Sequence, residues 1–390
     1  MRLEDICTVF ADGDWIESKD QSESGIRLVQ TGNIGEGIFL EKEVRAKYIT
    51  EDTFDKFKCT EIFSGDILVS RLPEPVGRAC IVPEKAERMI TAVDCTICRP
   101  NEALISKEYL CYFMRSKAYY TRLLGNVTGT TRKRISRKNL GKVELRVPAK
   151  DEQKAVVEQL DCLVKVIDSR TKELLLLDNL IKARFVEMFG DPSTNPLSWD
   201  ETTIGDECFY IKDGPHKSLP DIGKENRGHP FISVRNIVNG YIDFSTARYI
   251  SDEDYANAIK KCHPEKGDML YSKGGTTGVA KLIDIDVEFA NWVHVAVLKF
   301  DKTKLNGVFF ENMLNGAYCY EQSQRLTKGI ANRDLVLSAM AKIKMYRPPM
   351  ELQNKFADFV HQVDKSKVAV QKALDETQIL FDSLMQKYFG

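Results

Sequence analysis

The sequence predicts a mixed α/β fold in which two long antiparallel helices, forming a coiled coil, separate two globular domains related by a pseudo-two-fold internal repeat. Three observations predict this fold. The chain repeats itself at an offset of about 200 residues, as expected for a duplication. Each copy begins with short apolar runs between turn residues, which is typical of strands. Each copy then ends in about 40 residues whose apolar side chains recur at helical spacing.

The repeat sets the expected boundaries. Residues 28–37 (LVQTGNIGEG) match 231–240 (FISVRNIVNG), and 65–71 (GDILVSR) match 267–273 (GDMLYSK). Strand-like runs such as RACIVP and HVAVLKF are accompanied by helical stretches such as 106–124 and 306–326. We therefore predict a first domain, a first helix, a second domain that starts with a short linker at 190–199, and a second helix. Their ranges are 1–149, 150–189, 190–349 and 350–390.

A proline precedes each predicted helix, where a helix can begin. At about 60 Å each, the helices would be longer than one domain core requires, so we expect a spacer. Their apolar stripes are expected to pack together as a coiled coil, antiparallel if the duplicated chain closes on itself. Alternatively, each stripe packs on its own domain. The residues expected to pair the helices or hold partners are Val156, Leu160, Leu163, Ile167, Leu174, Leu177, Ile181, Val360, Val363, Val370, Leu374, Phe381 and Leu384.

Composition places the chain among soluble globular proteins, with 43% hydrophobic and 29% charged residues over 390 positions. The acidic residues near the N-terminus are unlike a secretion signal, and no long apolar run predicts a membrane span, so we expect a cytoplasmic protein. The ten cysteines are expected to be free buried thiols. Cys95 and Cys98 form a CxxC motif, but a second such pair is missing, so no metal site is predicted.

The formal net charge of −1 argues against nucleic-acid binding, but binding requires a basic face and not a basic average. Residues 128–142 (TGTTRKRISRKNLGK) contain six basic residues and no acidic one. Such a segment suits contact with phosphates and base edges; the alternative is a solvated loop. Copy two has only Lys328, Arg333 and Lys342 there. The candidate contacts in this segment are Thr130, Thr131, Arg132, Lys133 and Arg134.

Other candidate DNA contacts follow the matched strands. A basic residue leads into a loop in both copies, and the second loop is rich in glycine and threonine but lacks the order of a phosphate-binding P-loop. Asn, Gln and Arg side chains in the segments 30–33 and 233–236 can read adenine or guanine, although an asparagine that stabilises a turn is the alternative. These further candidates are Gln30, Thr31, Asn33, Arg71, His216, Lys217, Arg235, Asn236, Lys273, Thr276 and Thr277.

The sequence predicts no catalytic residues. No glycine-rich turn followed by an acidic residue suggests a nucleotide or methyl-donor site, and no Asp/Asn-Pro-Pro-aromatic string occurs. Residues 152–154 (EQK) resemble the E-x-K element of nucleases. Copy two has LQN at 352–354, so that interpretation is rejected.

Over its whole length the chain resembles the DNA specificity subunit of Type I restriction-modification systems. The resemblance rests on the two helices introduced by VPAKDEQKAVVEQL and RPPMELQNKFADFV, the repeated GD-[IM]-L-x-S strand and the repeated N-[IV]-x-x-G segment. The first copy has Val147-Pro148 instead of a double proline. Its loop at 71–75 also lacks the glycines of 273–278, so contacts there are expected to differ between the copies.

The resemblance implies two target-recognition domains that read the two parts of a split, asymmetric DNA target, with the helices as a ruler. It also implies docking of two methyltransferase subunits and of restriction/translocase subunits. S-adenosylmethionine, ATP and Mg²⁺ would bind to those partners and not to this chain. Because the copies differ in sequence, we expect them to read different bases. The alternatives are the specificity half of another restriction-methylation enzyme class and a non-enzymatic coiled-coil scaffold that binds DNA.

Overall fold

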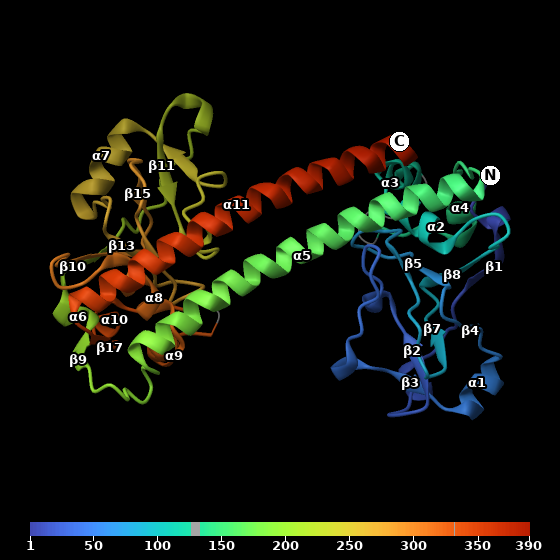
Figure 1. Ribbon diagram of the computed structural model, residues 1–390, viewed down its shortest axis with the longest axis horizontal. Coiled ribbons are helices and arrows are strands. Elements are labelled where there is room, and N and C mark those ends of the chain that lie inside the picture. The colour runs from blue at the N-terminus through green and yellow to red at the C-terminus, as the bar shows by residue number, and fades with distance from the viewer. Residues whose placement is uncertain (126–132, 331) are drawn as a thin grey trace. The chain divides into compact units, whose positions relative to one another are not determined.

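The computed structural model describes residues 1–125, 133–330 and 332–390. The chain forms two compact units. Unit 1 comprises Met1–Thr171 together with Lys372–Gly390, and unit 2 comprises Lys172–Gln371. Each unit therefore contains one globular part and segments of both long helices (Figure 1).

Unit 1 contains two four-stranded sheets. The first has the order β1-β8-β5-β6, with antiparallel neighbours over Cys7–Asp12, Cys95–Pro100, Ile67–Ser70 and Ala79–Ile81. The second has the order β3-β2-β7-β4 over Tyr48–Ile49, Ile26–Val29, Met89–Thr91 and Glu61–Ile62, and its central pair β2–β7 is parallel.

Strand β5 shows how the core of unit 1 is layered. All four of its residues are buried. Successive side chains of a strand point to opposite faces, so Ile67 and Val69 pack with the helices whereas Leu68 packs between the two sheets. The same alternation separates Cys95, between the sheets, from Cys98, on the helical side.

The short helices of unit 1 are α1 (Glu51–Phe57), α2 (Lys107–Phe113), α3 (Lys117–Leu124) and α4 (Arg137–Gly141). The residue before each helix is a threonine or serine whose side chain accepts a hydrogen bond from the first turn. Such N-caps satisfy backbone donors that have no partner within the helix. The helical stretch expected over 106–124 is thus two helices, divided at the cap Ser116.

Unit 2 repeats the order of the first sheet and has a smaller second sheet. Its first sheet has the order β10-β16-β13-β14, over Cys208–Asp213, Val295–Phe300, Met269–Ser272 and Ala280–Leu282. Its second has the order β12-β11-β15, over Arg248–Ile250, His229–Ile232 and Ala290–Asn291, again with one parallel pair. A two-stranded sheet joins β17 (Lys344–Arg347) to β9 (Asp200–Thr203). The short helices are α6 (Ile204–Glu207), α7 (Asp252–Lys261), α8 (Gly307–Asn315), α9 (Ala317–Leu326) and α10 (Leu337–Met340).

A register shift in the strand pairing occurs in both units. The pairing of β1 with β8 shifts register between Cys7 and Val9, and that of β10 with β16 shifts between Cys208 and Tyr210. A β-bulge of this kind bends a strand locally. Its presence at matching positions supports the common origin of the two copies.

The long helices are α5 (Lys150–Phe189) and α11 (Met350–Phe389). In each unit, segments of the two helices lie side by side and antiparallel (Figure 1). In unit 1, Tyr388 on α11 donates a hydrogen bond to Gln159 on α5. In unit 2, Phe185 of α5 packs on Phe356 of α11 with ring centroids 5.4 Å apart. The predicted mixed α/β fold with two antiparallel long helices is therefore confirmed.

The apolar stripes serve both of the expected roles. In unit 1, Leu160 and Phe381 share a core cluster with residues of α2. In unit 2, Ile181 and Val360 share one with residues of α8. The helices thus pack on each other and on the globular part of the same unit. Of the stripe residues, Val156, Leu160, Ile181, Val360, Val363 and Phe381 are buried, and the half-buried ones are Leu163, Ile167, Leu174, Leu177, Val370, Leu374 and Leu384.

Polar residues within the stripes have partners on the opposite helix. Arg170 donates to the Ala373 carbonyl and the Thr377 hydroxyl. Lys367 forms an ion pair of 2.6 Å with Asp178. Polar groups at helix contacts need such partners because burial removes water from them. These pairs fix which segment of α11 faces which segment of α5 within each unit.

A buried glutamine anchors the start of each long helix. Gln153 Nε2 donates to the carbonyls of Leu104 and Pro148, while its Oε1 accepts from Ser106 N. Gln353 makes the same three bonds with Lys304, Pro348 and Asn306. The glutamine shared by the two helix-initiating motifs therefore joins the helix to the loop before α2 or α8. No helix within the described ranges is long and apolar enough to cross a membrane.

Candidate nucleic-acid interface

The two asparagines predicted as base contacts stabilise turns. Asn33 Oδ1 accepts from Gln30 N, and its Nδ2 donates to Leu40 O at 2.8 Å. Asn236 Oδ1 accepts from Ser233 N, and its Nδ2 donates to Asp243 O at 2.8 Å. Both side chains are buried. The structure thus shows the alternative role for both residues, since internal bonds occupy both their donor and acceptor atoms.

The neighbours of these asparagines remain accessible. Gln30 and Arg235 are exposed and Thr31 is half-buried. Arg235 Nη2 donates to Thr246 O at 2.5 Å, which orients its guanidinium. Each asparagine turn therefore positions an exposed polar side chain beside it.

Arg71, which follows β5 in unit 1, points inward. Its Nη2 donates to the Val93 carbonyl, and its Nε lies 3.5 Å from Asp12 Oδ1. Burial lowers the pKa of Arg71, and the charge of Asp12 opposes that effect. The Arg71 carbonyl also accepts from Ile135 N at 3.3 Å, which ties the end of the basic segment to the sheet.

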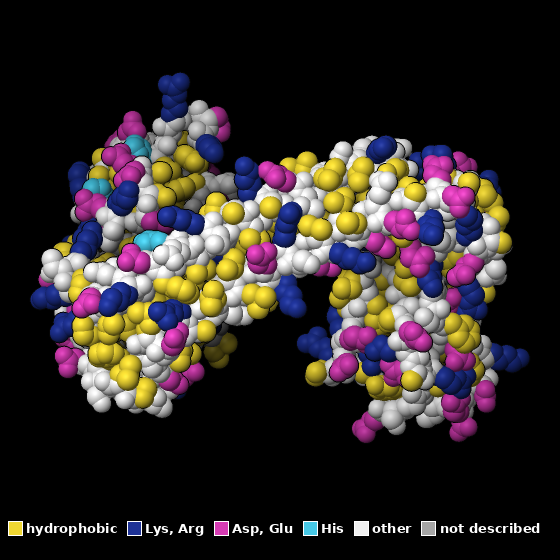
Figure 2. Space-filling view, viewed as in Figure 1, with side chains coloured by type: hydrophobic (Ala, Val, Ile, Leu, Met, Phe, Trp, Pro, Cys, Tyr) yellow, Lys and Arg dark blue, Asp and Glu magenta, His cyan; other side chains and the backbone are white. Residues whose placement is uncertain are grey.

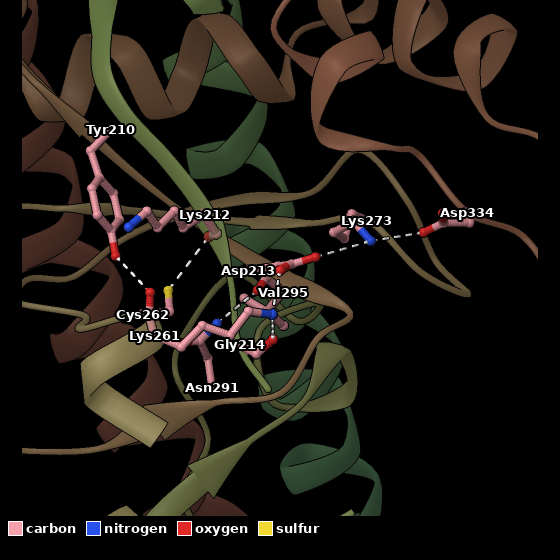
Figure 3. Close-up of polar contacts among 10 residues, drawn as sticks. All are labelled: Tyr210, Lys212, Asp213, Gly214, Lys261, Cys262, Lys273, Asn291, Val295 and Asp334. Carbon is pink, nitrogen blue, oxygen red and sulfur yellow. Dashed lines mark hydrogen bonds and ion pairs between the residues drawn. The ribbon is translucent and has the colours of Figure 1, made fainter. Parts of the chain in front are cut away.

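Lys273, at the matching position in unit 2, forms a larger network (Figure 3). Its Nζ lies 2.9 Å from Asp334 Oδ1 and 3.5 Å from Asp213 Oδ2. Asp213 also accepts from Lys261 Nζ at 2.9 Å. The backbone of Lys273 accepts from Leu335 N at 2.7 Å. Side chain and backbone of Lys273 thus hold the segment 333–335 against the sheet.

Neighbouring hydrogen bonds tie β10 to the end of α7, and β15 to β16. Lys261 Nζ donates to Gly214 O at 2.5 Å, and Cys262 Sγ donates to Lys212 O at 3.5 Å (Figure 3). Asn291 Nδ2 donates to Val295 O at 2.7 Å. Burial raises the pKa of Cys262 to about 11, so the thiol stays protonated near neutral pH. The network is therefore a structural support under the loops that follow β10 and β13.

A cavity of about 610 Å³ opens above this support in unit 2. Arg235, Trp292, His294 and Arg333 are among its lining residues, together with Gly274 and other short or polar side chains. A smaller hollow of about 200 Å³ shares Arg235 and Trp292 and adds Arg248. The indole and imidazole rings contact each other edge to face at 4.9 Å. The site combines flat aromatic walls with several hydrogen-bond donors.

Two ring nitrogens of this cavity lack partners. Trp292 Nε1 and His294 Nδ1 are buried, and neither is hydrogen-bonded within the part of the chain that the structure describes. An indole N–H can only donate, so any partner of Trp292 must carry an acceptor.

In unit 1, the described part of the basic segment 128–142 places positively charged side chains on the surface. Lys133, Arg134, Arg137 and Lys138 are all exposed. Arg134 forms an ion pair of 2.7 Å with Asp94, which leaves the guanidinium on the surface but restrains it. The predicted contacts Thr130, Thr131 and Arg132 lie outside the described residues.

The remaining predicted contacts are divided between surface and core. His216, Lys217 and Thr276 are exposed. Thr277 is buried and its hydroxyl lies 3.0 Å from that of Thr327. The exposed candidate residues thus lie on loops, and the buried candidate residues hold the ends of such loops in place.

We did not predict Trp292, His294, Arg248 or Arg333 as contacts from the sequence. A signal was available, because Trp292 and His294 stand where the first copy has Ala92 and Asp94. Differences between copies at matched loop positions mark sites that the common fold does not require. Such positions are candidates for the specificity of one unit.

The long helices leave apolar side chains uncovered. Leu175, Leu176, Leu180 and Val186 on α5 and Val368 on α11 each expose between 46% and 70% of their surface. Figure 2 shows hydrophobic side chains along the visible face of these helices. A group of exposed apolar side chains of this kind is typical of a protein–protein contact.

The comparisons with known proteins agree with this architecture. The family model "Type I restriction modification DNA specificity domain" matches residues 1–177 and 196–377, one match for each copy. The MjaIX specificity subunit of Methanocaldococcus jannaschii is 22% identical over 303 residues, covering 74% of this chain and 69% of that protein. The putative MjaX specificity subunit of the same organism is 21% identical over 397 residues, covering 95% and 89%.

Solved structures show the same fold. The crystal structure of a Type I restriction-modification S subunit from M. genitalium has a TM-score of 0.57 at 16% identity, covering 100% of this chain and 95% of that one. A chain from a structure that describes complex assembly and conformational transition of the type I R-M system has a TM-score of 0.58 at 17% identity, covering 100% and 96%. At these identities the structural likeness supports the fold.

Proposed function

The chain belongs to the Type I restriction-modification DNA specificity family, and on that premise we propose how its two units divide the reading of DNA. Its role is that of the non-catalytic subunit that supplies sequence specificity. We propose that unit 1 and unit 2 each read one part of a split, asymmetric target. The recognition domains would be 1–149 and 190–349, with the helices over 150–189 and 350–390 as the spacer.

The different surfaces of the two units support different half-sites. At matched positions, unit 1 has Asp94 paired with Arg134, whereas unit 2 has His294 in place of the acid and the acidic Asp334 in place of the arginine. Base edges are distinguished by their pattern of donors and acceptors. Surfaces with opposite patterns therefore suit different bases.

Exposed and buried candidates have different proposed roles. We assign direct DNA contact to the exposed residues of both units, including the basic segment of unit 1. We assign Arg71 and Lys273 a positioning role, because each holds a loop from beneath. Phosphate contacts set the register of a protein on DNA, and base contacts provide the sequence information.

The exposed apolar side chains on α5 and α11 are the proposed docking surface for two methyltransferase subunits. These partners would supply S-adenosylmethionine and the chemistry on adenine. Restriction/translocase subunits would add ATP- and Mg²⁺-dependent steps. A formal net charge of −1 is compatible with this division, since the partners share the contact with DNA. The complex would act in the cytoplasm, where its DNA is.

A single observation carries the proposal: one fold occurs twice in the chain but presents different side chains at the matching loops. The test is genome-wide mapping of adenine methylation in cells that carry this chain with its methyltransferase, compared with cells that lack only this chain. We expect one split, asymmetric motif that depends on the chain. Two identical half-sites would contradict the division of labour, and retention of the complete motif after deletion of residues 1–149 would favour a scaffold.

A further inference from the structure

We propose that the unit 2 cavity lined by Arg235, Trp292, His294 and Arg333 receives the major-groove edge of a guanine in the half-site that this unit reads. The inference rests on the proposed function and adds a base and its reading residues. Guanine presents two acceptors, O6 and N7, in the major groove. The cavity presents hydrogen-bond donors from two guanidinium groups, those of Arg235 and Arg333.

The two arginines are held in a manner suited to base readout. Arg333 Nη2 donates to Gln324 Oε1 and lies 3.4 Å from Thr277 Oγ1. Arg235 Nη2 donates to Thr246 O at 2.5 Å. These bonds orient the planes of the guanidinium groups and use one nitrogen of each. Bidentate reading of guanine requires such a fixed plane.

The backbone of the wall is also adapted to close approach. A Cβ atom on Gly274 would lie 2.1 Å from His294 Nδ1, so only glycine allows the imidazole to pack there. A Cβ atom on Gly275 would meet nothing within 4 Å, which leaves open space in front of the ring wall. Gly274 thus lets the imidazole pack against the backbone, and Gly275 adds no side chain to the cavity lining.

The acidic member of the lining does not oppose this ligand. Asp334 lies 2.9 Å from Lys273 Nζ, which neutralises its charge. Its side chain remains partly exposed, and a carboxylate can accept from the amino group of the cytosine paired with the guanine. The lining therefore fits a G·C pair, with the guanine at the arginines and the cytosine at the carboxylate.

Unit 1 cannot form the same site. Leu72, Ala92 and Asp94 stand at the positions of Gly274, Trp292 and His294. These three residues supply neither the aromatic rings nor the glycine that allows close approach. Asp94 instead forms an ion pair with Arg134. Reading of guanine by this mechanism is therefore a property of unit 2 alone.

The test uses the purified complex of this chain with its methyltransferase and DNA duplexes in which each base pair of the unit 2 half-site is varied in turn. Methylation rates are compared for wild type, Arg333→Gln and the control Arg325→Gln, which removes the same charge from an exposed position on α9. Wild type and the control are expected to require guanine at one position. Arg333→Gln is expected to reduce that preference by about 10- to 100-fold and to leave the other positions unchanged.

The conservative variant Arg333→Lys guards against misfolding because it retains the positive charge. We expect it to methylate the cognate duplex but to discriminate poorly at the guanine, since lysine lacks the planar fork. Equal loss of rate at all four bases would identify a phosphate contact and overturn the assignment. A half-site without guanine, or unchanged selectivity in both Arg333 variants, would do the same while the proposed function stands. Absence of any split motif in wild type would instead contradict the proposed function.

Discussion

Replacing Gln353 by alanine tests how the second long helix is joined to its globular part. The side chain is fully buried at the start of α11. It donates to Pro348 O at 2.7 Å and Lys304 O at 3.2 Å, and accepts from Asn306 N at 2.8 Å. Gln353→Ala removes all three bonds and leaves the buried Pro348 carbonyl and the part-buried Lys304 carbonyl and Asn306 N–H without this partner.

The expected decrease in stability follows from those groups. A hydrogen bond contributes about 1 kcal/mol net, and a buried group left without a partner costs at least as much. Removal of three bonds therefore predicts a decrease of about 3 kcal/mol in the free energy of opening at this junction. Since 1.36 kcal/mol is a factor of ten, amides around the junction should exchange with solvent about 100-fold faster.

Hydrogen exchange followed by mass spectrometry measures this opening locally, on peptides that cover α8 and the start of α11. Gln362→Ala is the matched control, because Gln362 is exposed on the same helix and its replacement changes the helix propensity by the same amount. Peptides from β5 and β8 of unit 1 should exchange as in wild type. A change below about threefold at the junction, or an equal change in the control, would refute the reasoning.

Three other perturbations have definite expected results. Lys273→Met should destabilise the segment 333–335 by about 2 kcal/mol, less than for a fully buried ion pair, because Asp334 is partly exposed; unchanged exchange of that segment would contradict the positioning role. Replacing Lys133 and Lys138 by glutamine should lower the slope of log affinity against log salt by about 0.9 for each phosphate that is no longer neutralised, whereas substitution of an exposed lysine on α1 should not. The buried thiol of Cys208 has its pKa raised to about 12, so it should resist a thiol reagent at pH 8 whereas the exposed Cys162 reacts. Because the pKa of Cys208 is higher in the folded state than in an unfolded chain, its contribution to the free energy of unfolding is present below the pKa of an unfolded thiol and is lost as the pH rises toward 12. Urea unfolding should therefore give a lower free energy of unfolding at pH 10.5 than at pH 8.

The architecture could be predicted because the sequence carries it twice. Helix bounds at Phe189 and Phe389 follow from matched prolines, glutamines and apolar stripes, each of which is a local pattern. The turn role of Asn33 and Asn236 was foreseen only as an alternative, because the same side chain suits a turn or a base edge. The hydrogen bonds that these two asparagines donate to the carbonyls of Leu40 and Asp243 cannot be predicted from local sequence patterns.

Most of the site could not be predicted because its geometry depends on distant segments. Arg71 and Lys273 follow a strand and precede a loop, which suggested exposure. Their direction is set by Asp12 and by Asp213, which come from strands about 60 residues earlier in the sequence. The unpartnered nitrogens of Trp292 and His294 become apparent only when the loops of three strands meet around one cavity.

The division of α11 between the units has a consequence for exchanging recognition domains between related chains. Met350 and the following turns are tied to the second domain through Gln353, yet Phe389 at the other end packs on Tyr109 of the first, with ring centroids 5.2 Å apart. A graft that ends at either terminus of the helix would therefore pair one domain with a foreign helix end. A junction in the middle of α11, near the unit boundary at Gln371, would keep each end with the domain it evolved against. Successful chimeras, whether natural recombinants or designed ones, should have their crossovers within the helices and not at the domain edges.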